Sequence, residues 1–214
     1  MSRPLALGLL LALAASLAGC AAAVIGVGGA AAYSALEDRR TAGAQLEDEA
    51  TELRAADRIG QRFGEAAHVN VTSFNRVVLL TGEVPDAASR AEIERMVQGL
   101  PNVRSVANEL EIAGVSSLTA RTNDSLITSN VKLRFLDAEF NILHVKVVTE
   151  AGIVYLMGIV TEQEGNDAAE VARTTSGVRK VVKVFEYCKP TDDACRPPAP
   201  ASAPAPAQKA RPGG

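Results

Sequence analysis

The stretch "VVLLTGEV" (residues 77–84) returns in similar form as "IVYLMGIV" (residues 153–160), 76 residues further along the chain. The shift aligns identical residues, pairing Leu80 with Leu156, Gly82 with Gly158 and Val84 with Val160. A second pair of stretches, "NVRSVANEL" (102–110) and "GVRKVVKVF" (177–185), is related by a shift of 75. Self-similarity at a nearly fixed period marks a repeated structural unit. The sequence therefore predicts two similar modules in tandem.

Each module is expected to contain the same five elements. Its first helix is indicated, in the first copy, by apolar residues at helical spacing: Leu46, Ala50, Leu53 and Ala56. Two alternating runs follow as strands, with turns near residues 73–76 and 149–152, where Gly152 can take a positive φ. A helix over 86–99 and a strand over 103–112 close the first unit. The predicted fold class is α+β, with two tandem αββαβ modules, each with two helices packed on a small mixed sheet.

Gly82 and Gly158 fall inside predicted strands, where glycine ordinarily weakens the strand. A glycine in this position indicates a bulge or the close approach of a helix. Either feature is expected in both modules, because the repeat keeps the glycine.

The repeat sets the domain limits. Module 1 covers residues 43–113 and module 2 covers 121–188, joined by a linker at 114–120. Residues 189–214 form a tail that is rich in Pro and Ala, a composition typical of extended, disordered segments. Each module is small enough to be marginally stable alone, so we expect the two to pack together.

The charge of the chain excludes one broad class of partner. Its formal net charge is −3, whereas binding to nucleic acid needs clustered Lys and Arg. Module 1 has 7 basic and 12 acidic residues, and module 2 has 8 and 9, so module 2 is less repelled by an anionic surface. Arg179, Lys180 and Lys183 form a basic group of the kind usual on a solvated sheet edge.

The chain begins with an apolar run. Residues 5–17 contain no charge and follow Arg3, as in an export signal. The run is shorter than the roughly 20 residues that span a bilayer. Adding residues 21–32 would make it long enough, so length alone leaves a membrane span open.

The segment Leu17-Ala18-Gly19-Cys20 resembles the lipobox of bacterial lipoproteins. The resemblance implies that residues 1–19 are a signal peptide, that Cys20 is acylated, and that residues 20–42 are a lipidated leader. Ala21 follows the cysteine in place of the Asp that often marks inner-membrane retention. The expected location is the outer membrane, with the acyl anchor in its inner leaflet and the protein on the periplasmic face.

The two remaining cysteines, Cys188 and Cys195, have six residues between them. In an oxidising periplasm they are expected to pair in a structural disulfide. Free thiols and intermolecular pairing are the alternatives. Neither histidine is near them in sequence, which disfavours a metal site.

The paired modules, with "L.G.V" ending the second strand and "GV..V" opening the third, resemble BON domains. With the lipobox, the chain resembles the dual-BON outer-membrane lipoproteins of the DolP (YraP) type. The most specific segments are "TNDSLITSNVKLRFL" (122–136) and "VKVVTEAGIVYLMGIVTEQEG" (145–165). The resemblance implies a non-enzymatic function: binding of anionic phospholipid through module 2 and support of outer-membrane integrity, with links to cell division.

The resemblance assigns lipid contact to the first helix of module 2, which is expected to begin at Asn123 or Asp124, both good N-caps. Ile127, Val131 and Phe135 should face the sheet. The expected lipid-binding residues lie on other sides of the helix: Arg121, Leu126, Asn130, Lys132, Leu133 and Arg134. The alternative is that Leu126 and Leu133 pack against module 1. Relatives can carry a Trp at the Leu126 position, and this chain has none.

Catalysis is not predicted, nor is any cofactor or metal. His68 and His144 occupy corresponding positions near strands, without a recognisable Ser, Cys or carboxylate constellation in the sequence. The alternative function is an interaction adaptor that binds an envelope protein, for example in peptidoglycan remodelling at division, without lipid selectivity. A hydrolase is the least favoured reading.

Overall fold

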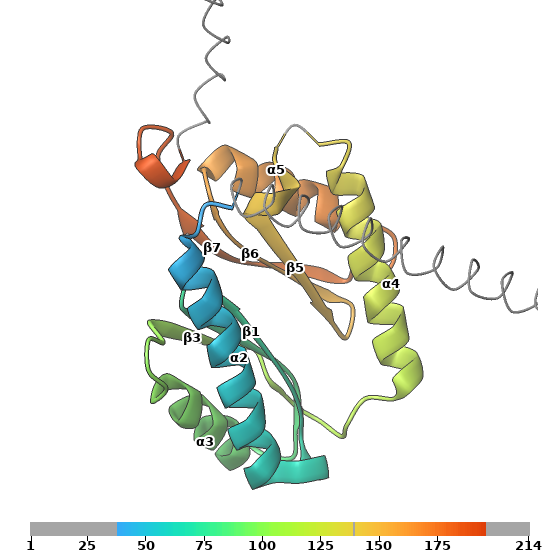
Figure 1. Cartoon of the computed structure of the whole chain (residues 1–214). Coiled ribbons are helices and arrows are strands. Elements are labelled where there is room, and N and C mark those ends of the chain that lie inside the picture. Colours follow the sequence, from blue (N-terminus) through green and yellow to red (C-terminus); the bar gives the residue numbers. More distant parts are fainter. Residues whose placement is uncertain (1–37, 139, 196–214) are drawn as a thin grey trace, which may run out of the picture.

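The computed structural model describes residues 38–138 and 140–195, which form two modules packed against each other (Figure 1). The predicted signal peptide, Cys20 and the part of the predicted tail beyond Cys195 lie outside these residues.

Module 1 contains the predicted elements in the predicted order. They are α2 (Ala42–Phe63), η1 (Gly64–Ala66), β1 (His68–Phe74), β2 (Val77–Val84), α3 (Ala87–Gln98), β3 (Ser105–Asn108) and β4 (Glu111–Ile112). Strand β2 pairs antiparallel with β1 and parallel with β3 and β4, which makes the sheet mixed. The strand expected over 103–112 is split, because Leu110 turns into the core and its backbone N–H bonds to the Asn108 side chain.

Module 2 repeats this arrangement. Its elements are α4 (Leu118–Phe135), η2 (Ile142–His144), β5 (Val145–Glu150), β6 (Ile153–Val160), α5 (Glu162–Arg173), β7 (Lys180–Tyr187) and the short η3 (Asp193–Cys195). Strand β6 is antiparallel to β5 and parallel to β7. The α+β class and the tandem αββαβ modules are confirmed.

The start of α4 differs from the prediction. The helix begins at Leu118, inside the expected linker, and Ser117 is its N-cap, accepting a hydrogen bond from the Ala120 N–H at 3.2 Å. The predicted caps, Asn123 and Asp124, lie inside the helix. Asp124 does not cap the helix, because its carboxylate accepts the backbone N–H groups of the β5–β6 turn.

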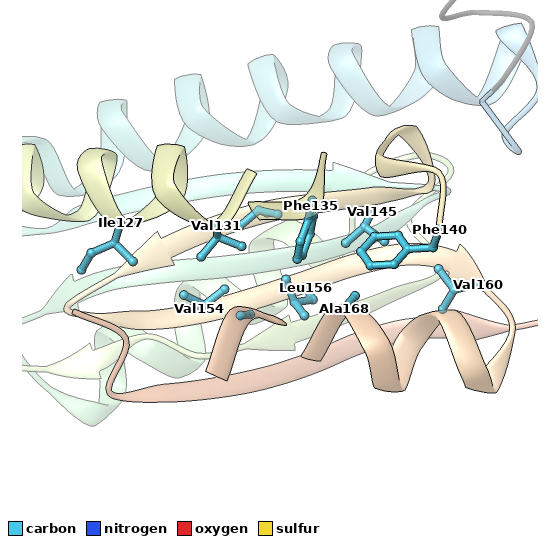
Figure 2. Close-up of a cluster of buried hydrophobic side chains, with 11 residues drawn as sticks. Ile127, Val131, Phe135, Phe140, Val145, Val154, Leu156, Val160 and Ala168 are labelled. Atoms are coloured by element: carbon cyan, nitrogen blue, oxygen red, sulfur yellow. The ribbon is translucent and has the colours of Figure 1, made fainter. Parts of the chain in front are cut away.

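In each module, both helices cover the same face of the sheet. Figure 2 shows Ile127, Val131 and Phe135 on the side of α4 that faces the sheet, as predicted, above Val154 and Leu156 of β6. The equivalent core of module 1 is built from α2, β2 and α3: Ala55, Ile59, Val78, Leu80, Val84, Ile93 and Val97. These apolar faces account for the helix-on-sheet packing.

The apolar residues that indicated α2 do not all line its inner face. Leu46 and Leu53 are 69% and 73% exposed. Apart from Ile59, the buried residues of α2 are small or polar: Ala44, Asp48, Thr51 and Ala55. Apolar spacing indicates this helix without marking its inner face, because that face includes Asp48, which holds the β1–β2 turn.

The two strand glycines permit close approach of neighbouring strands. A Cβ at Gly82 would lie 2.0 Å from the carbonyl oxygen of His68, and one at Gly158 would lie 2.2 Å from that of His144. The expectation of a bulge or a close helix is therefore wrong. The β1–β2 and β5–β6 registers run without interruption through these residues.

The helix-free faces of the two sheets pack together, as expected for small modules. Phe74 and Leu79 of module 1 share one buried cluster with Tyr155, Met157 and Ile159 of module 2. At the edge of this contact Glu186 accepts hydrogen bonds from Asn75 and Arg104. A disulfide joins Cys188 to Cys195, and Cys195 lies in the same cluster.

Candidate functional site

The outer face of α4 carries a row of exposed leucines. Leu126 and Leu133 are 59% and 60% exposed, on the side of the helix away from Ile127 and Val131. Leu118, at the start of the helix, and Leu136, at its C-cap, extend the row and are 79% and 63% exposed. The alternative that Leu126 and Leu133 pack against module 1 is wrong. In Figure 1, α4 lies along one side of the molecule.

The charges along α4 are unbalanced on its outer side. The helix has three basic residues and one acidic residue, Asp124. Asp124 is buried, and its carboxylate accepts the backbone N–H groups of Ala151 and Gly152 at 2.9 and 2.8 Å. The solvent-exposed residues of α4 therefore include cations and no carboxylate.

The three predicted cations have different local roles. Arg121 donates to the hydroxyl and the carbonyl oxygen of Ser116, both at 3.1 Å. Arg134 donates to the carbonyl oxygen of Val171 and the hydroxyl of Thr175, both at 2.8 Å, and so ties α4 to α5.

Lys132 is exposed and lies beside a hollow of about 320 Å³ that Arg40 and Lys146 also line. Asn130 is exposed between the two leucines in sequence. Of the six predicted lipid-binding residues, five are exposed along α4 and Arg121 is partly buried, and both arginines also support the helix.

The buried Asp124 has a counterpart that sequence reasoning missed. In module 1, Asp48 accepts the backbone N–H groups of Asn75 and Arg76 at 2.7 and 2.8 Å. The same 76-residue shift that relates the strands relates these Asp residues and the turns they hold. We call this feature the Asp clasp. The turn residues all have positive φ: 49° at Asn75, 67° at Arg76, 49° at Ala151 and 73° at Gly152. The repeat itself was the available signal.

The histidines also have carboxylate neighbours that sequence reasoning missed. His68 Nδ1 lies 3.0 Å from Glu83 Oε2, and His144 Nδ1 lies 3.5 Å from Glu164 Oε1. His68 and Glu83 are cross-strand partners, which the predicted turn at 73–76 implied. The carboxylate of Glu164 also accepts hydrogen bonds from the Arg39 guanidinium. Burial alone would raise its pKa, but hydrogen bonds from Arg39 and Thr161 hold the pKa of Glu164 at about 2.

Residues 51–114 and 123–189 each match the BON domain. The chain belongs to the BON-domain family. Outer membrane lipoprotein DolP of Haemophilus influenzae is 38% identical over 174 residues, which cover 80% of this chain and 90% of DolP. The 21 kDa hemolysin of Actinobacillus pleuropneumoniae is 35% identical over 70% of this chain and 79% of its own length. Osmotically-inducible protein Y of Escherichia coli is 32% identical over 55% of this chain and 60% of its own length.

This BON-domain chain is of the dual-BON DolP type, and its similarity to DolP supports a lipid-anchored location in the outer membrane, facing the periplasm. The BON matches and the similarity point to a non-catalytic envelope protein. Among the described residues, no helix combines the length and hydropathy needed to cross a bilayer.

Proposed function

We propose that the protein binds anionic phospholipid through the outer face of α4 and thereby supports outer-membrane integrity. The observation that carries the proposal is the leucine row, exposed beside Lys132 on a helix whose only acid is buried. A membrane-surface helix combines apolar residues that enter the headgroup region with cations that meet lipid phosphate. The chain's similarity to DolP, an outer membrane lipoprotein, agrees with this role.

The expected affinity of α4 alone is modest. Full burial of a leucine side chain contributes about 1.5–3 kcal/mol. Each cation near an anionic surface adds about 1 kcal/mol. A Trp side chain suits the membrane–water interface because its ring carries a polar N–H group, and Leu126 has no such group. We therefore assign membrane residence mainly to acyl chains on Cys20, at about 0.8 kcal/mol per buried methylene, and lipid preference to α4.

The test is cosedimentation with vesicles, using the chain from residue 20 with Cys20→Ser so that no acyl chain contributes. Binding is expected to phosphatidylglycerol-containing vesicles and not to pure phosphatidylcholine. Leu126→Asp should weaken it at least tenfold, because a charge replaces an inserting side chain. Leu53→Asp is the matched control, since Leu53 is a similarly exposed leucine on α2, and it should bind as the parent does.

Equal binding to both vesicles would refute the preference for anionic lipid. Absence of binding to either would refute lipid recognition by α4 and favour the adaptor function, with an envelope protein as the partner. The integrity role is tested in cells that lack the gene. The acylated Leu126→Asp protein should restore detergent resistance less well than the Leu53→Asp protein at equal abundance.

A further inference from the structure

Three side chains able to bind a metal converge where the modules meet. His68 begins β1 and Glu83 faces it from β2, so both belong to module 1. Glu150 ends β5 in module 2. One ligand atom from each residue lies within 4.8 Å of the other two. Both carboxylates are buried, with Glu83 6% and Glu150 7% exposed, and His68 is partly buried.

Neighbouring polar groups hold the two carboxylates in place. Glu150 accepts a hydrogen bond from the Asn70 side-chain amide at 2.7 Å and one from the Thr81 hydroxyl at 3.4 Å. Glu83 accepts the backbone N–H of Ser116 at 3.2 Å. Such outer contacts orient ligands in metal sites and raise metal affinity.

The local charge favours a cation. The carboxylates of Glu83 and Glu150 have oxygen atoms within 4.8 Å of each other. A hollow of about 240 Å³ is lined by His68, Glu150 and Asp124, and also by Arg121. Arg121, however, donates to Ser116. Among the described residues, neither Glu83 nor Glu150 forms an ion pair with Lys or Arg, so a divalent ion between the two carboxylates would balance their charge.

We propose that His68, Glu83 and Glu150 form a binding site for a divalent transition-metal ion of the Zn²⁺ class, which bridges the two modules. An imidazole nitrogen with two carboxylate oxygens is a ligand set that suits Zn²⁺, and it leaves a coordination position for water. Because the ligands come from both modules, the bound ion strengthens their packing. This site is separate from the outer face of α4 and does not depend on phospholipid binding.

The test is calorimetric titration of Zn²⁺ into the untagged chain from residue 20, with Cys20→Ser, under non-reducing conditions that keep the Cys188–Cys195 disulfide. One ion should bind per chain, and the melting temperature should rise. His68→Ala and Glu150→Gln should each weaken binding at least tenfold. His144→Ala is the matched control and should bind as the parent does, because His144 occupies the equivalent position in module 2 and lies outside the cluster.

A second readout does not depend on binding energies. The chain has 2 histidines, so their imidazole NMR signals can be assigned with His144→Ala. Zn²⁺ should shift the signals of His68 and leave those of His144 in place. If His68→Ala fails to fold, Glu150→Gln and Glu83→Gln, which keep side-chain size, replace it. Unchanged affinity in these variants, no measurable binding by the parent, or a shift confined to His144 would overturn the proposal.

Discussion

Helices α2 and α4 occupy the same position in the two modules and share the Asp clasp, but their outer faces differ. Both expose two leucines seven residues apart, Leu46 and Leu53 on α2 and Leu126 and Leu133 on α4. Helix α2 has five acidic and three basic residues, a net charge of −2. Helix α4 has one acid, which is buried, and three basic residues, a net charge of +2. Packing constrains the inner face of the repeat, while the outer face is free to acquire a separate function.

The largest expected effect concerns the glycines that the two modules share. Gly82→Ala and Gly158→Ala should each lower the free energy of unfolding by about 3 kcal/mol or more, because the new Cβ would collide with a backbone carbonyl. Gly82→Ala should be the worse of the two, since Gly82 also has a φ of 113°. Denaturant unfolding measures both. A loss below about 1 kcal/mol at either site would show that the strands separate easily and that the close approach is not a shared requirement.

The Asp clasp should be the next most sensitive feature. Asp48→Ala should lower the free energy of unfolding by about 3 kcal/mol and Asp124→Ala by about 2 kcal/mol, because buried donors lose a charged acceptor. Asp48 has the larger expected effect, since it also accepts from Ser73 and Arg40. Asp57→Ala, at an exposed site on α2, is the control in the same unfolding assay. Equal losses of unfolding free energy on replacing Asp48, Asp124 and Asp57 would contradict a stabilising role of the Asp clasp.

The difference between the outer faces is tested by charge reversal. Lys132→Glu should lower affinity for phosphatidylglycerol vesicles by roughly 30-fold at low salt, because it changes two charges at about 1 kcal/mol each. The effect should shrink as salt screens the surface. Arg54→Glu, an exposed site on α2, should leave affinity unchanged. If Arg54→Glu weakens binding as much as Lys132→Glu does, total charge rather than the face of α4 controls binding.

The smallest expected effect concerns Arg39, which precedes α2 and binds Glu164 of module 2 with its guanidinium at 2.7 Å. Glu164 has a folded-state pKa of about 2, below the ordinary value of 4.5, so its ion pair stabilises the fold above that ordinary value. This stability is lost as pH falls from about 5 to 2. Arg39→Ala should therefore cost about 1–2 kcal/mol at pH 7 and much less near pH 2. Unfolding curves at several pH values measure this, and a cost independent of pH would contradict it.

Much of the scaffold was predictable from the sequence because its signals are local. The repeat predicted the element order, the two turns and the positive φ of Gly152, and helical spacing predicted the inner face of α4. In α2 the apolar spacing indicated the helix but not its inner face, which holds Asp48 and small residues while Leu46 and Leu53 are exposed. Periodicity reports burial only where apolar side chains supply the packing.

The sequence by itself determined the two modules, their αββαβ order and the inner face of α4, since these follow from periodicity and from turn chemistry within each copy. Tertiary structure alone decided which residue caps α4: the carboxylate of Asp124 binds a turn 27 residues away, and Ser117, which was not among the expected caps, is the cap. It also brought Glu150 to His68 and Glu83 across the module boundary. That contact arises from the packing of two sheets, whose relative placement no local pattern specifies.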